Sequence, residues 1–327
     1  MMKPLLIILS FLFATNAFAG YGGYIGAHDN RRYGSLSEPE YNGVVKLNVG
    51  GGRCTGIFVS KNIVLTNNHC VVACKNGCEA EFWNGSGYET SNLKVLAYNA
   101  KAKLSNGTDW GLLLSDKDSN FYKSIAPMSA TGQVQRGGYG ILRIIEDDEI
   151  PFLKDLYAKT KQEFKEECNK SPNIIGCFNR HIDKKLAKLG KKQLFKDGNN
   201  FKVQTCNIIG DSQKSNRIMQ TDCDSSSGDS GAPLLRNNTI VGLNSDGLQT
   251  VFGDRKTNAD AVKTENFYIP VQGFISKHAN ITDSWYEYVN DEKDEEMLGP
   301  VNSDLAQESS DTGFEAIQSM LQDLDCD

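Results

Sequence analysis

Three short strings, far apart in the 327-residue chain, carry the residue types that can activate a serine hydroxyl. In chain order they are Thr66-Asn67-Asn68-His69-Cys70, Asp109-Trp110-Gly111 and Gly228-Asp229-Ser230-Gly231-Ala232-Pro233. A neutral imidazole can take the hydroxyl proton as the oxygen attacks, while a buried carboxylate holds the other ring N–H. We therefore interpret Ser230 as nucleophile, His69 as general base and then acid, and Asp109 as the orienting carboxylate.

The glycines around Ser230 fit the second requirement of that chemistry. The oxygen that becomes negatively charged needs two backbone N–H groups converging on it. Gly228 and Ser230 can supply them, because glycine adopts main-chain conformations that other residues resist. We expect Asp229 to point inward toward a cationic partner, and Gly231 to leave room for the histidine ring. A lone buried histidine is more often structural, but all three strings together make coincidence improbable.

The N-terminus has the pattern of a secretory signal peptide over residues 1–19. Lys3 gives a positive start, residues 5–13 are apolar, and Ala17-Phe18-Ala19 is a small-x-small cleavage site. The apolar run is too short to span a bilayer, and no later segment is long and apolar enough to do so. We expect a mature chain from Gly20 that is secreted or periplasmic.

The cysteines fit an oxidising compartment, where disulfides persist. All nine lie in the expected mature chain, and Cys326 is left over if the others pair. The favoured pairs are Cys54–Cys70, Cys74–Cys78, Cys168–Cys177 and Cys206–Cys223, although sequence alone cannot fix connectivity. A zinc site is the competing interpretation, disfavoured because no histidine pair accompanies the cysteines. We expect no metal and no other cofactor.

Short apolar-alternating runs separated by turn residues predict strands in two successive groups. The first group is 44–49, 55–59, 63–66, 93–97 and 110–114. The second is 140–145, 201–209, 217–221, 232–235, 239–244 and 267–271. About six short strands in each group predict an all-β fold of two packed antiparallel β-barrels.

Residues 151–197 break this rhythm, since their apolar residues recur at helical spacing. Pro151 stands where a first helical turn tolerates proline. We predict a lysine-rich helical hairpin, clipped by Cys168–Cys177 and inserted into the second barrel. It is either a surface decoration or an arm that recognises a substrate or a partner.

The composition shifts again in the C-terminal segment 283–327, which follows the expected domain at 20–282. From Asp283 onward there are fourteen Asp or Glu and one Lys. Such a run is usually solvated and flexible. It could lie across the basic hairpin, or across the active site as an inhibitor. The net charge of −6 gives no reason to expect nucleic-acid binding, and we expect a monomer that acts on proteins or peptides.

The three strings resemble those of the trypsin-like (chymotrypsin-fold) serine endopeptidases. The family's Thr-Ala-Ala-His-Cys and Gly-Asp-Ser-Gly-Gly-Pro differ from the strings here by only a few residues. The resemblance covers roughly residues 25–278 without the insertion. It implies two β-barrels with the active site in the cleft between them, and peptide hydrolysis through an acyl-enzyme. Residues 25–31 and Asp222-Cys223-Asp224 look closer to the bacterial glutamyl endopeptidases.

The resemblance is less decisive about specificity. Asp224 stands six residues before the serine, where trypsin-like members use an aspartate to attract Lys or Arg, although glutamyl endopeptidases can carry it too. Glutamyl endopeptidases typically have a histidine where this chain has Asn244, and Ser226 replaces a cysteine of many trypsins. Cleavage after Lys or Arg is therefore favoured, with glutamyl specificity as the alternative. Ser245 and Gly247 are implied to hold the substrate main chain as an added strand.

One further expectation comes from the resemblance, and there are two alternatives to a protease. A freed amino group near Tyr24 or Ile25 could pair with Asp229, which would make residues 20–23 or 20–24 a short pro-segment. A non-catalytic binding module on a protease scaffold is an alternative, but such proteins usually lose a triad residue. An acyl hydrolase with a Gly-x-Ser-x-Gly elbow is disfavoured, because Ala232 takes the last glycine's place.

Overall fold

The computed structural model describes residues 30–50, 52–99, 102, 106–171, 174–247 and 259–278. They belong to one compact unit, Phe18–Val301. The expected signal peptide, the cleavage points near Tyr24 and Ile25, the acidic segment 283–327 and Cys326 lie outside the described residues and stay predictions. Among the described helices, none is both long and apolar enough to cross a membrane.

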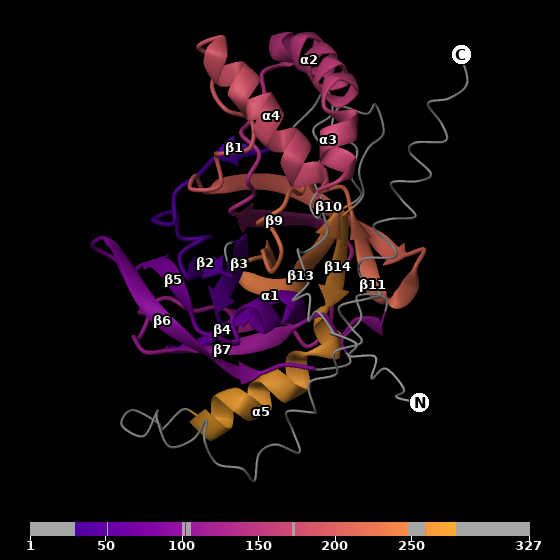
Figure 1. The fold of residues 1–327 in the computed structure, drawn as a ribbon. Helices are drawn as coiled ribbons and strands as arrows, with labels where there is room; N and C mark the ends of the chain where they lie inside the picture. The colour runs from indigo at the N-terminus through magenta and orange to yellow at the C-terminus, as the bar shows by residue number, and fades with distance from the viewer. Residues whose placement is uncertain are drawn as a thin grey trace, which may run out of the picture. The chain divides into compact units, whose positions relative to one another are not determined.

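The first barrel is closed by six antiparallel strands in the order β2-β3-β4-β7-β6-β5 (Figure 1). The strands are β2 (Val44–Val49), β3 (Gly52–Phe58), β4 (Ile63–Thr66), β5 (Cys78–Trp83), β6 (Tyr88–Ala97) and β7 (Gly111–Ser115). Every residue of β4 and β7 is buried. The short helix α1 (Asn68–Ala73) follows β4 directly, which places His69 at the end of a buried strand.

The second barrel is also antiparallel, and its circuit is closed because β9 pairs with both β10 and β12. Its strands are β9 (Gly132–Gly138), β10 (Lys202–Ser212), β11 (Ser215–Thr221), β12 (Pro233–Arg236), β13 (Thr239–Gly247) and β14 (Ala259–Lys263). Two short strands pair with members of this barrel: β1 (Arg32–Tyr33) with β10, antiparallel, and β8 (Ser124–Ile125) with β13, parallel. The predicted all-β fold of two barrels is confirmed.

The two barrels pack on each other through a shared hydrophobic cluster. It contains buried residues of the first barrel, such as Ile57 and Leu112, together with Leu243 and Val262 of the second. Burial of this kind contributes roughly 25 cal/mol per Å² of apolar area removed from water. The segments that face each other across this junction are therefore held in fixed relative positions.

One predicted strand, 140–145, is wrong. Residues 140–145 are not a strand, and Leu142 and Ile145 instead pack with Leu153, Ile182 and Leu186 of the insertion. The run is apolar because helices of the insertion cover it. An apolar run in the sequence indicates that a segment is buried, but not whether strands or helices bury it. The strand that belongs here is β9, whose Gly-Gln-Val-Gln-Arg-Gly-Gly sequence offers little apolar pattern.

The predicted strand 267–271 is also wrong, because a 3₁₀ turn (Thr264–Asn266) and helix α5 (Tyr268–His278) occupy this region. Phe267 and Val271 are fully buried and four residues apart, which is helical spacing. The run is too short for its pattern to separate helix from strand.

The insertion between β9 and β10 is helical, as predicted. A 3₁₀ turn (Asp147–Glu149) leads into α2 (Ile150–Glu163), followed by a short α3 (Lys165–Asn169) and α4 (Ile174–Lys188). The Cys168–Cys177 disulfide joins α3 to α4 and clips the hairpin. The helical part ends at Lys188 rather than near residue 197, and a non-helical segment returns the chain to β10.

Candidate active site

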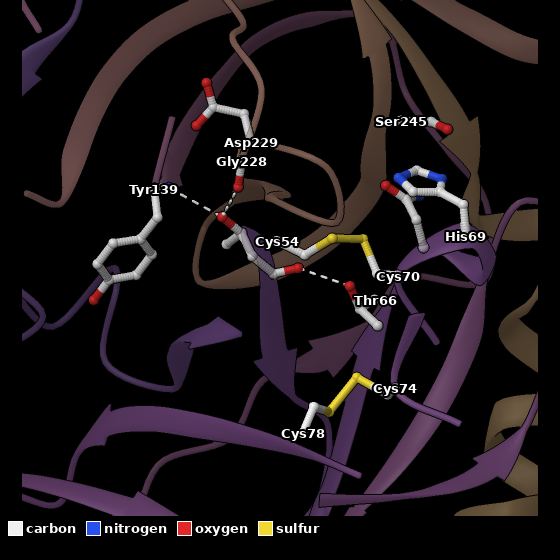
Figure 2. Close-up of a disulfide and its surroundings, with 12 residues drawn as sticks. Cys54, Thr66, His69, Cys70, Cys74, Cys78, Tyr139, Gly228, Asp229 and Ser245 are labelled. Carbon is white, nitrogen blue, oxygen red and sulfur yellow. Dashed lines mark hydrogen bonds between the residues drawn. A yellow bond between two sulfur atoms is a disulfide. The ribbon is translucent and has the colours of Figure 1, made fainter. Parts of the chain in front are cut away.

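His69 is held in place by its neighbours in the chain. It is the second residue of α1, and the adjacent Cys70 forms a disulfide with Cys54 of β3 (Figure 2). A second disulfide, Cys74–Cys78, joins the end of α1 to β5. All four predicted disulfides are formed, including Cys206–Cys223 in the second barrel. The helix that carries the histidine is therefore covalently tied to two strands of the first barrel.

Asp109 stands two residues before β7 and directs its carboxylate at the histidine ring. Its Oδ2 and Oδ1 lie 2.9 and 3.1 Å from His69 Nδ1, and Oδ1 also accepts the backbone N–H of His69 at 3.2 Å. The side-chain amide of Asn67 donates to the Asp109 carbonyl at 2.8 Å. A carboxylate at Nδ1 favours the tautomer with the proton there, which leaves Nε2 as the basic nitrogen.

The charge of Asp109 is stabilised although the residue is buried. Burial alone would raise the pKa of Asp109, but the facing His69 ring and hydrogen bonds from His69 and Ser245 lower it below its ordinary value. The hydroxyl of Ser245, on β13 of the second barrel, donates to Oδ2. The carboxylate is thus ionised at neutral pH and is held from both barrels.

Ser230 lies in the loop between β11 and β12, pressed against the first barrel. Its carbonyl accepts the N–H of Thr55 at 2.8 Å, and the N–H of Gly231 donates to the carbonyl of Asn244 at 2.8 Å. Gly231 has φ +80°, and a Cβ there would lie 2.1 Å from the Thr55 carbonyl oxygen and 2.3 Å from Thr66 Oγ1. The three atoms nearest to such a Cβ belong to Thr55, Thr66 and Asn67, and the expectation that Gly231 makes room for the His69 ring stays a prediction.

Gly228 begins the turn that holds Ser230. Its φ is +100°, and a Cβ there would lie 2.4 Å from the carbonyl oxygen of Tyr139, so glycine is required. The hydroxyl of Thr55 donates to the Gly228 carbonyl at 2.8 Å and accepts the N–H of Tyr139 at 3.0 Å (Figure 2). One threonine of β3 therefore binds this turn through both its backbone and its side chain.

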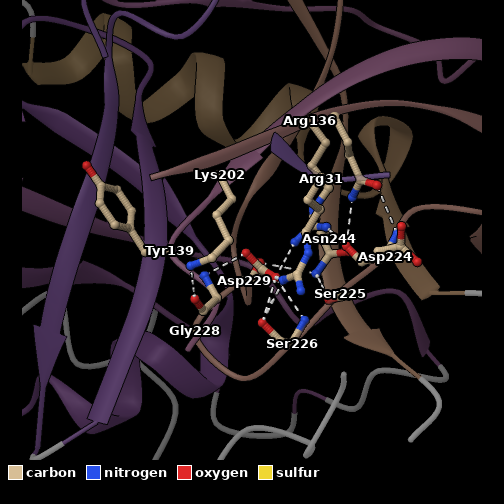
Figure 3. A network of polar contacts seen from close by, with 12 residues as sticks. Arg31, Arg136, Tyr139, Lys202, Asp224, Ser225, Ser226, Gly228, Asp229 and Asn244 are labelled. Atoms are coloured by element: carbon tan, nitrogen blue, oxygen red, sulfur yellow. Dashed lines mark hydrogen bonds and ion pairs between the residues drawn. The ribbon is translucent and has the colours of Figure 1, made fainter. Parts of the chain in front are cut away.

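Asp229 points inward, and its carboxylate is surrounded by donors (Figure 3). Oδ2 lies 2.7 Å from Arg136 Nη2 and 3.6 Å from Arg31 Nη1, and it accepts the N–H of Ser226 at 2.8 Å. Oδ1 accepts the N–H of Gly140 at 2.9 Å. Burial would raise the pKa of Asp229, but the two guanidinium groups and these hydrogen bonds lower it.

The predicted specificity residue Asp224 is buried close to this network. Its Oδ2 accepts the backbone N–H of Asn30 at 2.9 Å. The Gln204 side chain accepts the N–H of Asp224 at 3.1 Å and donates to its carbonyl at 2.7 Å. These contacts fix the backbone of Asp224, and its role toward substrate stays a prediction.

The other predicted substrate-binding residues lie along β13. Asn244 donates from Nδ2 to Ser225 Oγ at 3.2 Å and to the Asp229 carbonyl at 3.1 Å, so its amide braces the serine loop. Ser245 contacts Asp109 through its hydroxyl, while Gly247 pairs with Ala259 of β14 at the far end of the strand. The structure brings His69, Asp109 and Ser245 into direct contact and packs the Ser230 loop against the strand ends beside them.

Among the residues that the structure describes, two groups of cysteine and histidine side chains lie close enough to be considered as metal sites. They are Cys54, His69 and Cys70, and Cys168, Cys177 and His181. In both groups the cysteines are joined in a disulfide, so they offer no thiolate to a metal. The arrangement at His69 instead matches an imidazole oriented for proton transfer.

The sequence matches the family model of the trypsin-like peptidase domain over residues 54–243, which is more than half of the chain. The chain belongs to the trypsin-like peptidase family. It is by this membership a serine endopeptidase, and the matched range contains His69, Asp109 and Ser230. No curated protein matches the sequence.

Solved structures agree on the fold of this peptidase. A Glu endopeptidase in complex with MPD is 16% identical, with a TM-score of 0.50 over 78% of this chain and 100% of that chain. An inactivated protease paralogue of the scabies mite is 10% identical, with a TM-score of 0.50 over 76% of this chain and 97% of that chain. At these identities the likeness shows the fold alone.

Three residues that shape the site were not found from the sequence. The hydroxyl of Thr55 holds the Gly228 turn, and Arg136 and Arg31 neutralise Asp229. Ser245 was expected only to hold the substrate main chain, and its hydrogen bond to Asp109 was not foreseen. A usable signal existed for Arg136, since a charged residue inside a glycine-rich strand needs a buried partner if it faces inward. Threonine and serine in strands carry no comparable signal.

Removing the Cys54–Cys70 disulfide by a double alanine substitution is expected to cost about 3 kcal/mol of unfolding free energy. The same change should lower kcat at least tenfold, because α1 would no longer hold His69 firmly. The matched control removes Cys168–Cys177 in the insertion, which should lower stability while leaving kcat unchanged. Urea unfolding and peptide hydrolysis measure both effects, and equal losses of kcat in the two variants would contradict the prediction.

Proposed function

We propose that this peptidase hydrolyses peptide bonds through an acyl-enzyme on Ser230, with His69 as the base and Asp109 as its orienting carboxylate. The observation that carries the proposal is the contact of both Asp109 carboxylate oxygens with His69 Nδ1. The backbone N–H groups of Gly228 and Ser230 are proposed to stabilise the oxyanion, supported by the turn that Gly228 makes against Tyr139.

In the proposed first step, Ser230 Oγ attacks the carbonyl carbon of the scissile bond as His69 Nε2 takes its proton. The C–N bond then breaks, and the same proton passes to the leaving amine. Water repeats the sequence on the acyl-enzyme: His69 takes a proton from water, the hydroxide adds, and Ser230 Oγ leaves with that proton. Asp109 stays ionised throughout and stabilises the imidazolium.

Cleavage after Lys or Arg is the specificity we propose, with Asp224 as the carboxylate that attracts the cationic side chain. Asn244 supports this choice, because it carries no charge that would attract a glutamate and its amide already binds Ser225 and Asp229. The alternative is glutamyl specificity, for which the named activity of the Glu endopeptidase neighbour is the specific support.

The second alternative is a non-catalytic binding module. The scabies mite neighbour is named as inactivated and shares the fold, so the fold alone does not establish activity. This chain keeps the three residue types of the proposed triad, and two of them are in hydrogen-bond contact. That arrangement favours the catalytic function.

Secretion or export to the periplasm is part of the proposal, supported by four disulfides that persist in an oxidising compartment. We also propose that the protein is a monomer.

A contact between the acidic segment 283–327 and the lysines of the insertion is a hypothesis supported by their opposite charge. Recognition of a substrate or a partner by the insertion is also a hypothesis. It is supported by a cavity of about 770 Å³ between the segment that follows α4 and the first barrel, with Lys192, Tyr88 and Tyr139 in its wall.

A peptide library that varies the residue before the scissile bond tests the proposed function. We expect kcat/KM for Lys and Arg to exceed that for Glu at least tenfold. A preference for Glu would replace the specificity, and equal rates would contradict both assignments. Absence of cleavage by a folded protein that still binds the peptides would identify a binding module.

A further inference from the structure

The carboxylate of Asp229 adjoins Ser230 in the chain, and its burial makes its partners important. An unpaired buried carboxylate costs several kcal/mol, so the loop can hold Asp229 inside only if charges compensate it. Two guanidinium groups do so, from Arg136 at 2.7 Å and Arg31 at 3.6 Å. Both come from within the folded chain rather than from a chain terminus.

Arg136 reaches two points of the serine loop from the interior of the second barrel. It lies on β9 opposite Gln204 of β10 and Leu234 of β12, and its side chain is 2% exposed. One terminal nitrogen pairs with Asp229, and the other donates to the carbonyl of Asp224 (Figure 3). The planar, permanently charged fork thus fixes both ends of the segment 224–229.

Arg31 reaches the same segment from the stretch of chain just before β1 (Figure 3). Its Nη1 donates to Ser226 Oγ at 3.1 Å, and the preceding N–H of Asn30 donates to the Asp224 carboxylate at 2.9 Å. Pairing of β1 with β10 sets where this segment lies, since Arg32 is opposite Val203. Strand pairing therefore helps to fix the position of this segment.

The space around the Asp229 carboxylate is already filled. A Cβ at Gly138 or at Gly140 would lie 2.5 Å from its oxygens, so the backbone of both glycines packs directly against it. Gly140 also donates its N–H to Oδ1. An added ammonium group would have to displace a guanidinium to reach the carboxylate.

We infer that Arg136 and Arg31 are internal positioning residues that keep the Gly228–Ser230 turn in its working conformation, so that the enzyme needs no freed N-terminal amine. This inference rests on the proposed function. It replaces the expectation that cleavage near Tyr24 or Ile25 supplies the partner of Asp229. Activity is then present as soon as the domain has folded.

The charges around Asp229 also predict that replacing Arg136 by lysine makes the activity depend on pH. Arg136 faces it from β9, Arg31 from the N-terminal segment and Lys202 from β10, while Ser226 and Asn244 supply neutral donors. A guanidinium stays charged to above about pH 12, whereas a lysine ammonium loses its proton near pH 10 or lower when buried. Lys202 is present in every variant, so a comparison between variants isolates position 136.

The first test compares two forms of the full domain. One has a peptide fused before residue 20 and an intact chain through residue 31, and the other is cut specifically near Tyr24 or Ile25. We expect kcat/KM to agree within twofold. An uncut form at least 100-fold less active than the cut form would overturn the inference while leaving the proposed function standing. Inactivity of both folded forms would instead contradict the proposed function and this inference together.

The second test uses Arg136→Lys, with Arg236→Lys as a matched control at the partly exposed end of β12. We expect kcat/KM of the wild type to be the same at pH 9.5 as at pH 7.5. For Arg136→Lys, kcat/KM should fall at least tenfold between these two pH values. The control should follow the wild type. Identical profiles for all three proteins would overturn the role of Arg136. Arg136→Met should lose at least 100-fold at every pH, and the lysine variant still decides the matter if the methionine variant does not fold.

Discussion

Replacing Ser230 by alanine is expected to lower kcat for peptide hydrolysis by about 10⁵–10⁶-fold. The reason is that the acyl-enzyme cannot form without the hydroxyl, so only oxyanion stabilisation and substrate binding remain. His69→Ala should lose a similar factor, and the double variant should be no worse than either single one, because the two residues act as a unit. Initial rates on a fluorogenic peptide measure all three.

Two controls make this result specific. Ser86→Ala removes an exposed hydroxyl in the β5–β6 turn and should change kcat less than twofold. A phosphonate probe that reacts with activated serines should label the wild type at Ser230 and should not label the Ser230→Ala variant. Losses that multiply in the double variant, or activity that survives without Ser230, would contradict the proposed mechanism.

The candidate triad could be proposed from the sequence because its residue types are few and stand in short strings. The chain has four histidines, and the string around His69 identifies the relevant one without any three-dimensional information. Strand bounds were predictable for β2 and β4, which the structure reproduces. Both are short, largely buried apolar runs, and such a run bounded by turn residues indicates a strand in the sequence itself.

The errors share a physical cause, which is that burial can come from more than one kind of neighbour. The apolar run with Leu142 and Ile145 is covered by α2 and α4, and the run with Phe267 and Val271 is a helix on the barrels. In contrast, β9 contributes glycines whose missing side chains let Phe201 and Asp229 approach. A strand that contains several glycines, so that neighbouring side chains can pack against its backbone, has almost no hydrophobic pattern.

The positioning contacts of the site depend on tertiary pairing and could not be predicted from local sequence. The hydrogen bond from Thr55 to Gly228 joins residues 173 positions apart in the chain, and that from Ser245 to Asp109 joins residues 136 positions apart. Each joins a strand or loop of one barrel to the other. The residues proposed to react were therefore identifiable from motifs, whereas the residues that hold them in place required the fold.

Replacing Asp109 by asparagine is expected to lower kcat by about 10⁴-fold at neutral pH with little change in fold. The amide is nearly isosteric with the carboxylate, but its NH₂ group would donate to His69 Nδ1 and move the ring proton to Nε2. The ring would then be unable to accept the proton of Ser230, and no negative charge would stabilise the imidazolium. The Ser245 hydroxyl bond and the disulfide at Cys70 should keep the backbone in place.

Ser245→Ala is the matched control for this prediction, because it removes one hydrogen bond to the same carboxylate but leaves the carboxylate and the histidine intact. We expect less than a tenfold loss of kcat from Ser245→Ala and an unchanged KM for both variants. Circular dichroism and thermal unfolding establish that each is folded. A loss from Asp109→Asn no larger than that from Ser245→Ala would mean that Asp109 braces the junction between the barrels and does not orient the base.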